Sequence, residues 1–105
     1  MSEWLSNPST AELNDEFRRT TPHPLLTPGI YERDDALAIV MRVRTFDDFT
    51  PDNDPWGEHD FGAFDWQDIR VLWKIDYPDP DTGEFQDPAG KDTNRVLTIM
   101  TGDEY

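Results

Sequence analysis

The chain of 105 residues contains no cysteine and few basic residues. Without cysteine it forms no disulfide, no thiolate metal site and no thiol nucleophile. Only nine Lys and Arg stand against 23 Asp and Glu, which gives a formal net charge of −14 at pH 7. A surface of this sign repels nucleic acid phosphates and anionic lipids. We therefore expect no direct binding to nucleic acid or to a membrane.

Long apolar runs and a basic leader segment are also missing. No stretch approaches the ~20 apolar residues of a membrane-spanning helix. The first residues lack the basic and apolar regions of a signal peptide. The expected location is the cytoplasm.

The signatures of common enzyme sites are absent as well. Serine occurs only at Ser2, Ser6 and Ser9. There is no glycine-rich phosphate loop and no G-x-S-x-G nucleophile motif. We predict a protein that is not an enzyme and that needs no cofactor.

What the sequence does contain is a concentration of negative charge between Phe46 and Asp87. This segment holds thirteen Asp and Glu against Arg70 and Lys74, together with three of the four tryptophans. Like charges at this density repel one another on a folded surface. A cationic partner would offset that repulsion, whereas a solvated face that only maintains solubility is the plainer alternative.

Local patterns predict one domain over residues 1–105, with residues 1–8 as a flexible N-terminal arm. Ser9 and Glu12 form a capping-box pattern, which predicts a helix from Thr10 to Thr20. A second helix is predicted from Asp34 to Phe46. Its two leading aspartates would face the positive end of the helix dipole, and its apolar face would consist of Leu37, Val40, Met41 and Val43.

Strand patterns follow the second helix. Phe61 to Trp66 is the first predicted strand, and residues 69–77 alternate with a period of two. Val96 to Thr101 is the last, after a long acidic loop over residues 78–94. The predicted fold class is α+β, with two N-terminal helices packed on one face of a small antiparallel β-sheet of three to four strands.

Residues 50–62 concentrate oxygen-bearing side chains and one of the two histidines. Asp52, Asp54 and Gly57 match positions 1, 3 and 6 of an EF-hand calcium loop. Trp56 stands at position 5, however, and Ala63 stands where the bidentate Glu belongs. The EF-hand interpretation therefore fails.

Three interpretations of this loop stay open. A noncanonical metal site or a hydrolytic site would use Asp52, Asp54, Glu58, His59 and Asp60. Adjacent side chains such as Glu58, His59 and Asp60 seldom converge on one point, which weighs against catalysis. In the structural interpretation, Asp and Asn cap turns, His59 forms hydrogen bonds within the loop and Trp56 packs on the sheet.

The acidic surface itself favours a binding function. A net charge of about 2–8 in magnitude is ample for the solubility of a small domain. Carboxylates two residues apart on an extended strand lie about 6.5–7 Å apart, close to the spacing of phosphates along a nucleic acid strand. Asp52/Asp54, Glu58/Asp60 and Asp79/Asp81 have this sequence spacing. The predicted partner-binding residues are Asp47, Asp48, Asp52, Asp54, Trp56, Glu58, Asp60, Asp76, Asp79, Asp81, Glu84 and Asp87.

Three runs of sequence carry a resemblance to a bacterial protein family. They span residues 46–64, 72–77 and 95–100, and residues 13–19 fit the N-terminal helix of that family. On these runs the chain resembles the DUF3768 proteins. The resemblance implies kinship with accessory proteins of mobile elements, among which small acidic proteins often act as anti-restriction or anti-CRISPR inhibitors by mimicking DNA.

The leading hypothesis is therefore an acidic DNA mimic that blocks nucleic-acid binding by a bacterial defence complex. The expected partner is the basic DNA-binding surface of a CRISPR effector or, next, of a restriction complex. One alternative is a metal-binding or hydrolytic protein that uses the Asp52–Asp60 loop. Another is a plain acidic protein-interaction module that does not imitate DNA.

Overall fold

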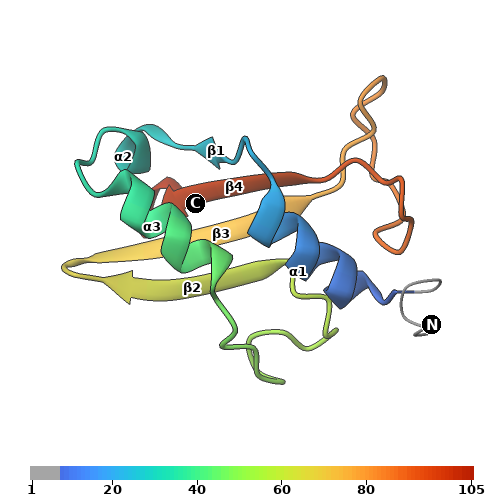
Figure 1. Ribbon diagram of the computed structural model, residues 1–105, viewed down its shortest axis with the longest axis horizontal. Helices are drawn as coiled ribbons and strands as arrows, with labels where there is room; N and C mark the ends of the chain where they lie inside the picture. Colours follow the sequence, from blue (N-terminus) through green and yellow to red (C-terminus); the bar gives the residue numbers. More distant parts are fainter. Residues whose placement is uncertain (1–7) are drawn as a thin grey trace.

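The computed structural model describes residues 8–105, so residues 1–7 of the predicted N-terminal arm lie outside the described part. The elements are α1 (Thr10–Thr20), β1 (Leu25–Leu26), α2 (Pro28–Tyr31), α3 (Ala36–Arg44), β2 (Phe61–Trp66), β3 (Ile69–Asp76), β4 (Val96–Thr101) and the 3-10 turn η2 (Gly102–Glu104). Figure 1 shows α1 and α3 lying across the same face of the sheet. The fold is a small α+β fold, as predicted.

The sheet has four strands in the order β1-β4-β3-β2. β2 and β3 form an antiparallel hairpin in which Phe64 lies opposite Val71. Its turn consists of Gln67 and Asp68, and Gln67 adopts a left-handed backbone with φ 55°. β3 also pairs antiparallel with β4. All three of these strands were predicted, β3 from its alternation.

The prediction of an antiparallel sheet is wrong at one edge. β1 pairs with β4 in parallel, with Leu25 opposite Thr98 and Leu26 opposite Ile99, so the sheet is mixed. The Thr27 amide extends this pairing by donating to the Ile99 carbonyl at 3.1 Å. A parallel partner needs a long crossover connection, and here residues 27–95 supply it. A two-residue strand carries no periodicity from which its direction could be predicted.

The prediction of two helices is incomplete, because α2 is a third. Pro28 occupies the first turn of α2, where its missing N–H costs nothing and its fixed φ suits a helix. The predicted α1 has the expected bounds, and both hydrogen bonds of the Ser9–Glu12 capping box are present. α3 is shorter at both ends than the predicted helix over residues 34–46.

The apolar face predicted for α3 is partly wrong. Ile39, Val40 and Val43 are the buried residues of α3, whereas Leu37 and Met41 are 74% and 52% exposed. This short helix carries two apolar stripes, one with Leu37 and Met41 and one with Ile39 and Val43. The stripe with Ile39 and Val43 packs in the core. Sequence periodicity alone does not decide between two such stripes.

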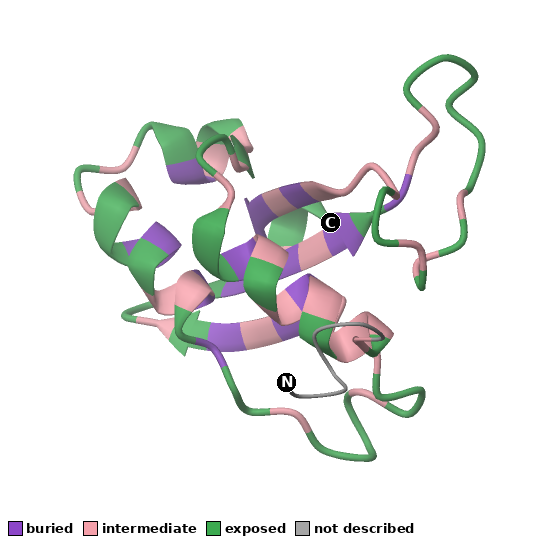
Figure 2. Cartoon of the chain, turned by 45° about the vertical axis from the view of Figure 1, so that its right-hand side comes forward, coloured by how far each residue is buried: buried purple, intermediate pink, exposed green. Residues whose placement is uncertain are grey.

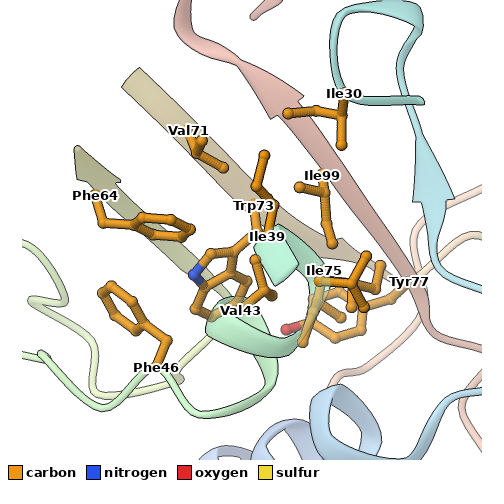
Figure 3. Packing of buried hydrophobic residues seen from close by; sticks show 12 residues of the cluster. Ile30, Ile39, Val43, Phe46, Phe64, Val71, Trp73, Ile75, Tyr77 and Ile99 are labelled. Carbon is orange, nitrogen blue, oxygen red and sulfur yellow. The ribbon is translucent and has the colours of Figure 1, made fainter. Parts of the chain in front are cut away.

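The core lies between the helices and the helix-facing side of the sheet (Figure 3). Trp73 in the middle of β3 is fully buried, with Phe46 edge-on at 5.5 Å between ring centroids. Gly62 on β2 lies directly over the Trp73 indole, where a Cβ atom would overlap it. The indole nitrogen of Trp73 has no hydrogen-bond acceptor among the described residues. Figure 3 shows this nitrogen on the side of the indole that faces the Phe46 and Phe64 rings.

Candidate partner-binding surface

Two long loops leave the sheet at the same end. The loop of residues 46–60 leads into β2, and the loop of residues 77–95 joins β3 to β4. The register places Phe61 opposite Lys74 and Asp76 opposite Val96, so both loops meet the sheet where β2 begins and β3 ends. Figure 1 shows both loops on the side where α1 begins. We call this part of the molecule, residues 46–60 and 77–95, the acidic end.

The acidic end carries an excess of carboxylates. The first loop holds six Asp and Glu and no Lys or Arg, and the second holds five against Lys91 and Arg95. The Arg95 guanidinium is directed inward, where it donates to the Gly90 carbonyl at 3.2 Å and to the Pro88 carbonyl. Lys91 is thus the one exposed cation of the two loops among the described residues.

Most of the predicted partner-binding residues are exposed, as Figure 2 shows for the two loops in green. The exposed acids are Asp47, Asp48, Asp52, Asp76, Asp81, Glu84 and Asp87. Trp56 is 84% exposed, so the interpretation in which it packs on the sheet is wrong. An exposed indole among carboxylates is available to a partner.

Other predicted binding residues are used inside the protein. The Asp54 side chain is 9% exposed and accepts hydrogen bonds from the backbone amides of Glu58 at 3.1 Å and His59 at 3.3 Å. Asp79 accepts from the amides of Asp81 and Thr82 at 2.8 and 3.1 Å. These two carboxylates hold turns, which gives Asp54 and Asp79 a structural role in the loops.

Glu58 and Asp60 lie where the first loop meets β2, and both are half-buried. Asp60 accepts a hydrogen bond from the Tyr77 hydroxyl at 3.1 Å. Burial raises the pKa of Glu58 from its usual value, and the negative charges of Asp60 and Asp54 raise it further. The neighbouring negative charges thus disfavour ionisation of Glu58.

The phosphate-like spacing inferred from sequence does not hold in the loops. Asp52 and Asp81 lie in turns, and His59, between Glu58 and Asp60, has a left-handed backbone with φ 57°. The backbone between these paired acids is bent, so the 6.5–7 Å strand spacing does not apply to them. The carboxylates come together because the loops are curved, and they are not spaced along an extended strand.

Asn14 on α1 connects the two loops. It is fully buried, and its side-chain amide donates to the Glu58 carbonyl of the first loop and to the Tyr77 hydroxyl, both at 2.9 Å. Its carbonyl oxygen accepts from Nε of Arg95 in the second loop at 2.7 Å. Burial raises the pKa of Tyr77 well above its usual range, so its phenol stays protonated and donates to Asp60. The arrangement fixes the bases of both loops to one helix.

Arg18, one helical turn after Asn14, fixes the start of the first loop. Its guanidinium donates to the Val43 carbonyl at 3.0 Å and the Phe46 carbonyl at 2.8 Å, and it forms an ion pair with Asp15 at 3.1 Å. The guanidinium carbon also lies 4.8 Å from the centre of the Trp73 ring. Burial lowers the pKa of Arg18, and Asp15 partly offsets this effect. Arg18 remains a cation that satisfies carbonyls at the C-terminal end of α3.

His59 is paired with a residue that the sequence interpretation did not consider. Its Nδ1 lies 2.9 Å from Asp15 on α1, its Nε2 lies 3.6 Å from Asp54, and its ring stacks on Phe49 at 3.8 Å. The interpretation in which His59 bonds only within its loop is therefore incomplete. Both ring nitrogens thus lie near carboxylates of the fold. The geometry offers no support for a hydrolytic role of His59.

The metal-binding alternative also lacks support from the geometry. Within residues 8–105, no three His, Asp or Glu side chains are grouped as ligands of one metal ion would be. Asp52 is exposed in a turn, Asp54 caps amides, and Asp60 bonds to Tyr77.

Comparison with known families identifies the kinship of the chain. Residues 26–104 match a family described as protein of unknown function, DUF3768. The chain belongs to the DUF3768 family. The match includes the acidic end and all four strands except Leu25, whereas α1, with Asn14 and Arg18, precedes it. The resemblance seen in the sequence is thereby confirmed at the level of the family.

No curated protein and no solved structure matches this DUF3768 chain. Among residues 8–105, no helix has both the length and the apolar character needed to cross a bilayer.

Proposed function

We propose that this DUF3768 protein is an acidic inhibitor that mimics DNA and blocks nucleic-acid binding by a bacterial defence complex. A CRISPR effector is the first candidate target and a restriction complex the second. The observation that carries the proposal is the gathering of exposed carboxylates from two separate loops at one end of the sheet, with Lys91 as the one exposed cation of these loops. A surface of this kind complements the Lys- and Arg-lined groove of a DNA-binding protein.

The loops are held in shape before any partner arrives. Asp54 and Asp79 cap turns within them, and Asn14 joins their bases. A partner that binds preordered loops loses less conformational freedom on association than one that must order them. This supports a rigid surface that imitates the fixed charges of a duplex.

Trp56 supplies an apolar contact within the same surface. It is 84% exposed and lies between Asp52 and Glu58 in sequence. Exposed aromatic residues that become buried at the centre of an interface contribute much of the binding energy. We propose that Trp56 inserts between the basic side chains of the target, while Asp47, Asp48 and Asp52 pair with them.

Charge reversal at one end of the molecule tests the proposal. The test variant is Asp47→Lys, Asp48→Lys and Asp52→Lys together, because no hydrogen bond involves these three carboxylates among the described residues. The matched control is Glu32→Lys, Asp34→Lys and Asp68→Lys, which makes the same change of net charge with three exposed acids at the opposite end.

The measurement is competition with duplex DNA for purified CRISPR effector and restriction complexes, over a range of salt concentrations. We expect the wild type and the control to displace DNA and the test variant to bind at least about tenfold more weakly, a change of about 1.4 kcal/mol. Binding of the wild type should weaken as salt rises. Equal loss in both variants would mean that only net charge matters, and failure of the wild type to displace DNA from any such complex would refute the proposal.

A further inference from the structure

The free edge of β2 presents unpaired backbone groups. β2 is the outer strand of the sheet. The Ile75 amide donates to the Asp60 carbonyl at 2.8 Å, which fixes the phase of the hydrogen bonding with β3. Since bonded and non-bonded pairs alternate in an antiparallel ladder, Gly62, Phe64 and Trp66 bond to β3. Phe61, Ala63 and Asp65 consequently direct their N–H and C=O groups away from the sheet.

Nothing in the described chain satisfies these outward groups. No backbone or side-chain hydrogen bond within residues 8–105 involves the amide or carbonyl of Phe61, Ala63 or Asp65, apart from the ladder itself. Phe46 and Phe49 pack near Trp73 on the helix side of the sheet, and Figure 1 shows no helix beyond β2. At the opposite edge the outer strand is β1, which is only two residues long.

The β2 edge also lacks the usual features that prevent strand pairing. Such edges commonly carry proline, lysine or a bulge. β2 contains neither proline nor a basic residue, and its pairing with β3 runs without interruption from Phe61 to Trp66. Its one charged side chain, Asp65, forms an ion pair with Arg70 of the neighbouring strand at 2.9 Å. The edge is thus a template for a further strand.

We propose that β2 pairs antiparallel with β2 of a second copy of this chain, about a two-fold axis through Ala63. In this register Ala63 lies opposite Ala63 of the second copy, and Phe61 lies opposite Asp65. All outward N–H and C=O groups of the three residues then find partners reciprocally, as an isologous interface requires. The sheet continues through both copies.

Side-chain size and charge both favour a second copy as the occupant. Ala63 places a small side chain at the axis, and Gly62, which has none, lies opposite Phe64 of the second copy. The acidic end lies where β2 begins. Antiparallel pairing directs the two acidic ends in opposite directions, which separates the charges of two chains that each carry −14. The inference does not depend on the proposed function, and it leaves both acidic ends free.

Mass measurement in solution tests this pairing with two variants and a control. Ala63→Pro removes an outward amide that the β2–β3 ladder does not use, a change that edge strands tolerate. Ala63→Lys places like charges opposite each other at the axis. Ala38→Lys is the control, since Ala38 is exposed on α3 and the charge change is the same. Both lysine variants lower the net negative charge, so general repulsion between copies would decrease in each.

Sedimentation equilibrium should give twice the 12.2 kDa chain mass for the wild type and for Ala38→Lys. It should give the mass of one chain for Ala63→Lys and Ala63→Pro. The proposal is overturned if the wild type stays at the mass of one chain at protein concentrations up to about 1 mM. A dissociation constant of about 1 mM corresponds to a dissociation free energy of about 4.1 kcal/mol. It is equally overturned if the dimer survives both Ala63 variants, since another face must then form it.

Amide hydrogen exchange locates the contact residue by residue. In the wild type we expect protection at all of Phe61–Trp66. In Ala63→Lys, protection should fall at Phe61 and Asp65 and persist at Gly62, Phe64 and Trp66, because only the last three bond to β3. Protection of Phe61 and Asp65 that appears only on addition of a target protein would mean that a strand of that target occupies the edge, and would reject the second copy.

Discussion

Replacing Arg18 should destabilise the fold far more than replacing its neighbour Arg19. Arg18 is 2% exposed and satisfies the Val43 and Phe46 carbonyls together with Asp15. Arg18→Met preserves much of the buried volume but leaves the Phe46 carbonyl without its donor. The Val43 carbonyl would keep only the Phe46 amide, and Asp15 would keep only His59. Removing one partner of a buried charged cluster costs about 3–5 kcal/mol. Arg19→Met is the matched control, because Arg19 forms only an exposed pair with Glu16, and such pairs contribute about 0–1 kcal/mol.

Arg18→Lys separates the effect of charge from that of geometry. Lysine keeps the positive charge but lacks the planar fork that donates in several directions at once. We expect it to serve only some of the three acceptors and to lower the free energy of unfolding by about 1–3 kcal/mol. The expected order of stability is wild type and Arg19→Met, then Arg18→Lys, then Arg18→Met.

Urea unfolding followed by tryptophan fluorescence measures this order, since Trp73 lies against the Arg18 guanidinium. For a chain of this size each kcal/mol lowers the melting temperature by roughly 4–8 °C, so Arg18→Met should melt at least about 12 °C below the wild type. If Arg18→Met and Arg19→Met unfold at the same urea concentration, the carbonyls are satisfied in some other way and the reasoning is refuted.

Two further predictions concern the C-terminal turn and the core. The pKa of Glu104 is lowered to about 2 by hydrogen bonds from Thr27, Thr101 and Gly29; its carboxylate therefore stabilises the fold above the unfolded pKa of about 4.3, and this stabilisation is lost as pH falls through about 2. Between pH 5 and pH 2, roughly the range between these pKa values, the urea midpoint should consequently change less with pH in Glu104→Gln than in the wild type. The same change of midpoint with pH in both proteins would contradict this role. Gly62→Ala should lower the free energy of unfolding by about 1–3 kcal/mol, because its Cβ would overlap the Trp73 indole; a urea midpoint equal to that of the wild type would show that the indole moves aside at little cost.

Local signals in the sequence predicted the regular elements well where their cause is local. The Ser9–Glu12 capping box defines the start of α1 within a few residues of chain. The alternation in β3 arises because its odd-numbered residues face the core. Pro28 of α2 is a comparable local signal, since proline is favoured in the first helical turn, but α2 was not among the predicted helices.

Long-range polar contacts were missed because nothing local encodes them. Asn14 and Arg95 are 81 positions apart, and His59 and Asp15 are 44 apart. One indirect signal existed: Asn14 and Arg18 lie four residues apart, beside the apolar pair Leu13 and Phe17. Polar residues in this position face the interior together with the apolar ones. They could have been identified as buried, although their partners could not.

The sequence predicted the excess of negative charge at the acidic end but not the conformation of its two loops. Counting charges identified both loops. It did not distinguish Asp52, which is exposed, from Asp54, which caps the turn that follows. The two residues differ by the backbone amides within their reach, and those depend on the folded path of the loop.

The position of β4 in the sheet constrains the order in which the protein can fold. β4 lies between β1 and β3, yet it is the last of the four strands along the chain, and Leu25 pairs with Thr98 across 73 residues. Until residues 96–101 have emerged from the ribosome, the nascent chain can form α1 and the β2–β3 hairpin but cannot join them to β1. Contacts of such high sequence separation slow folding. The growing chain therefore exposes the inner edge of β3, and the apolar side of its hairpin, to chaperones from the time that Asp76 emerges until β4 follows.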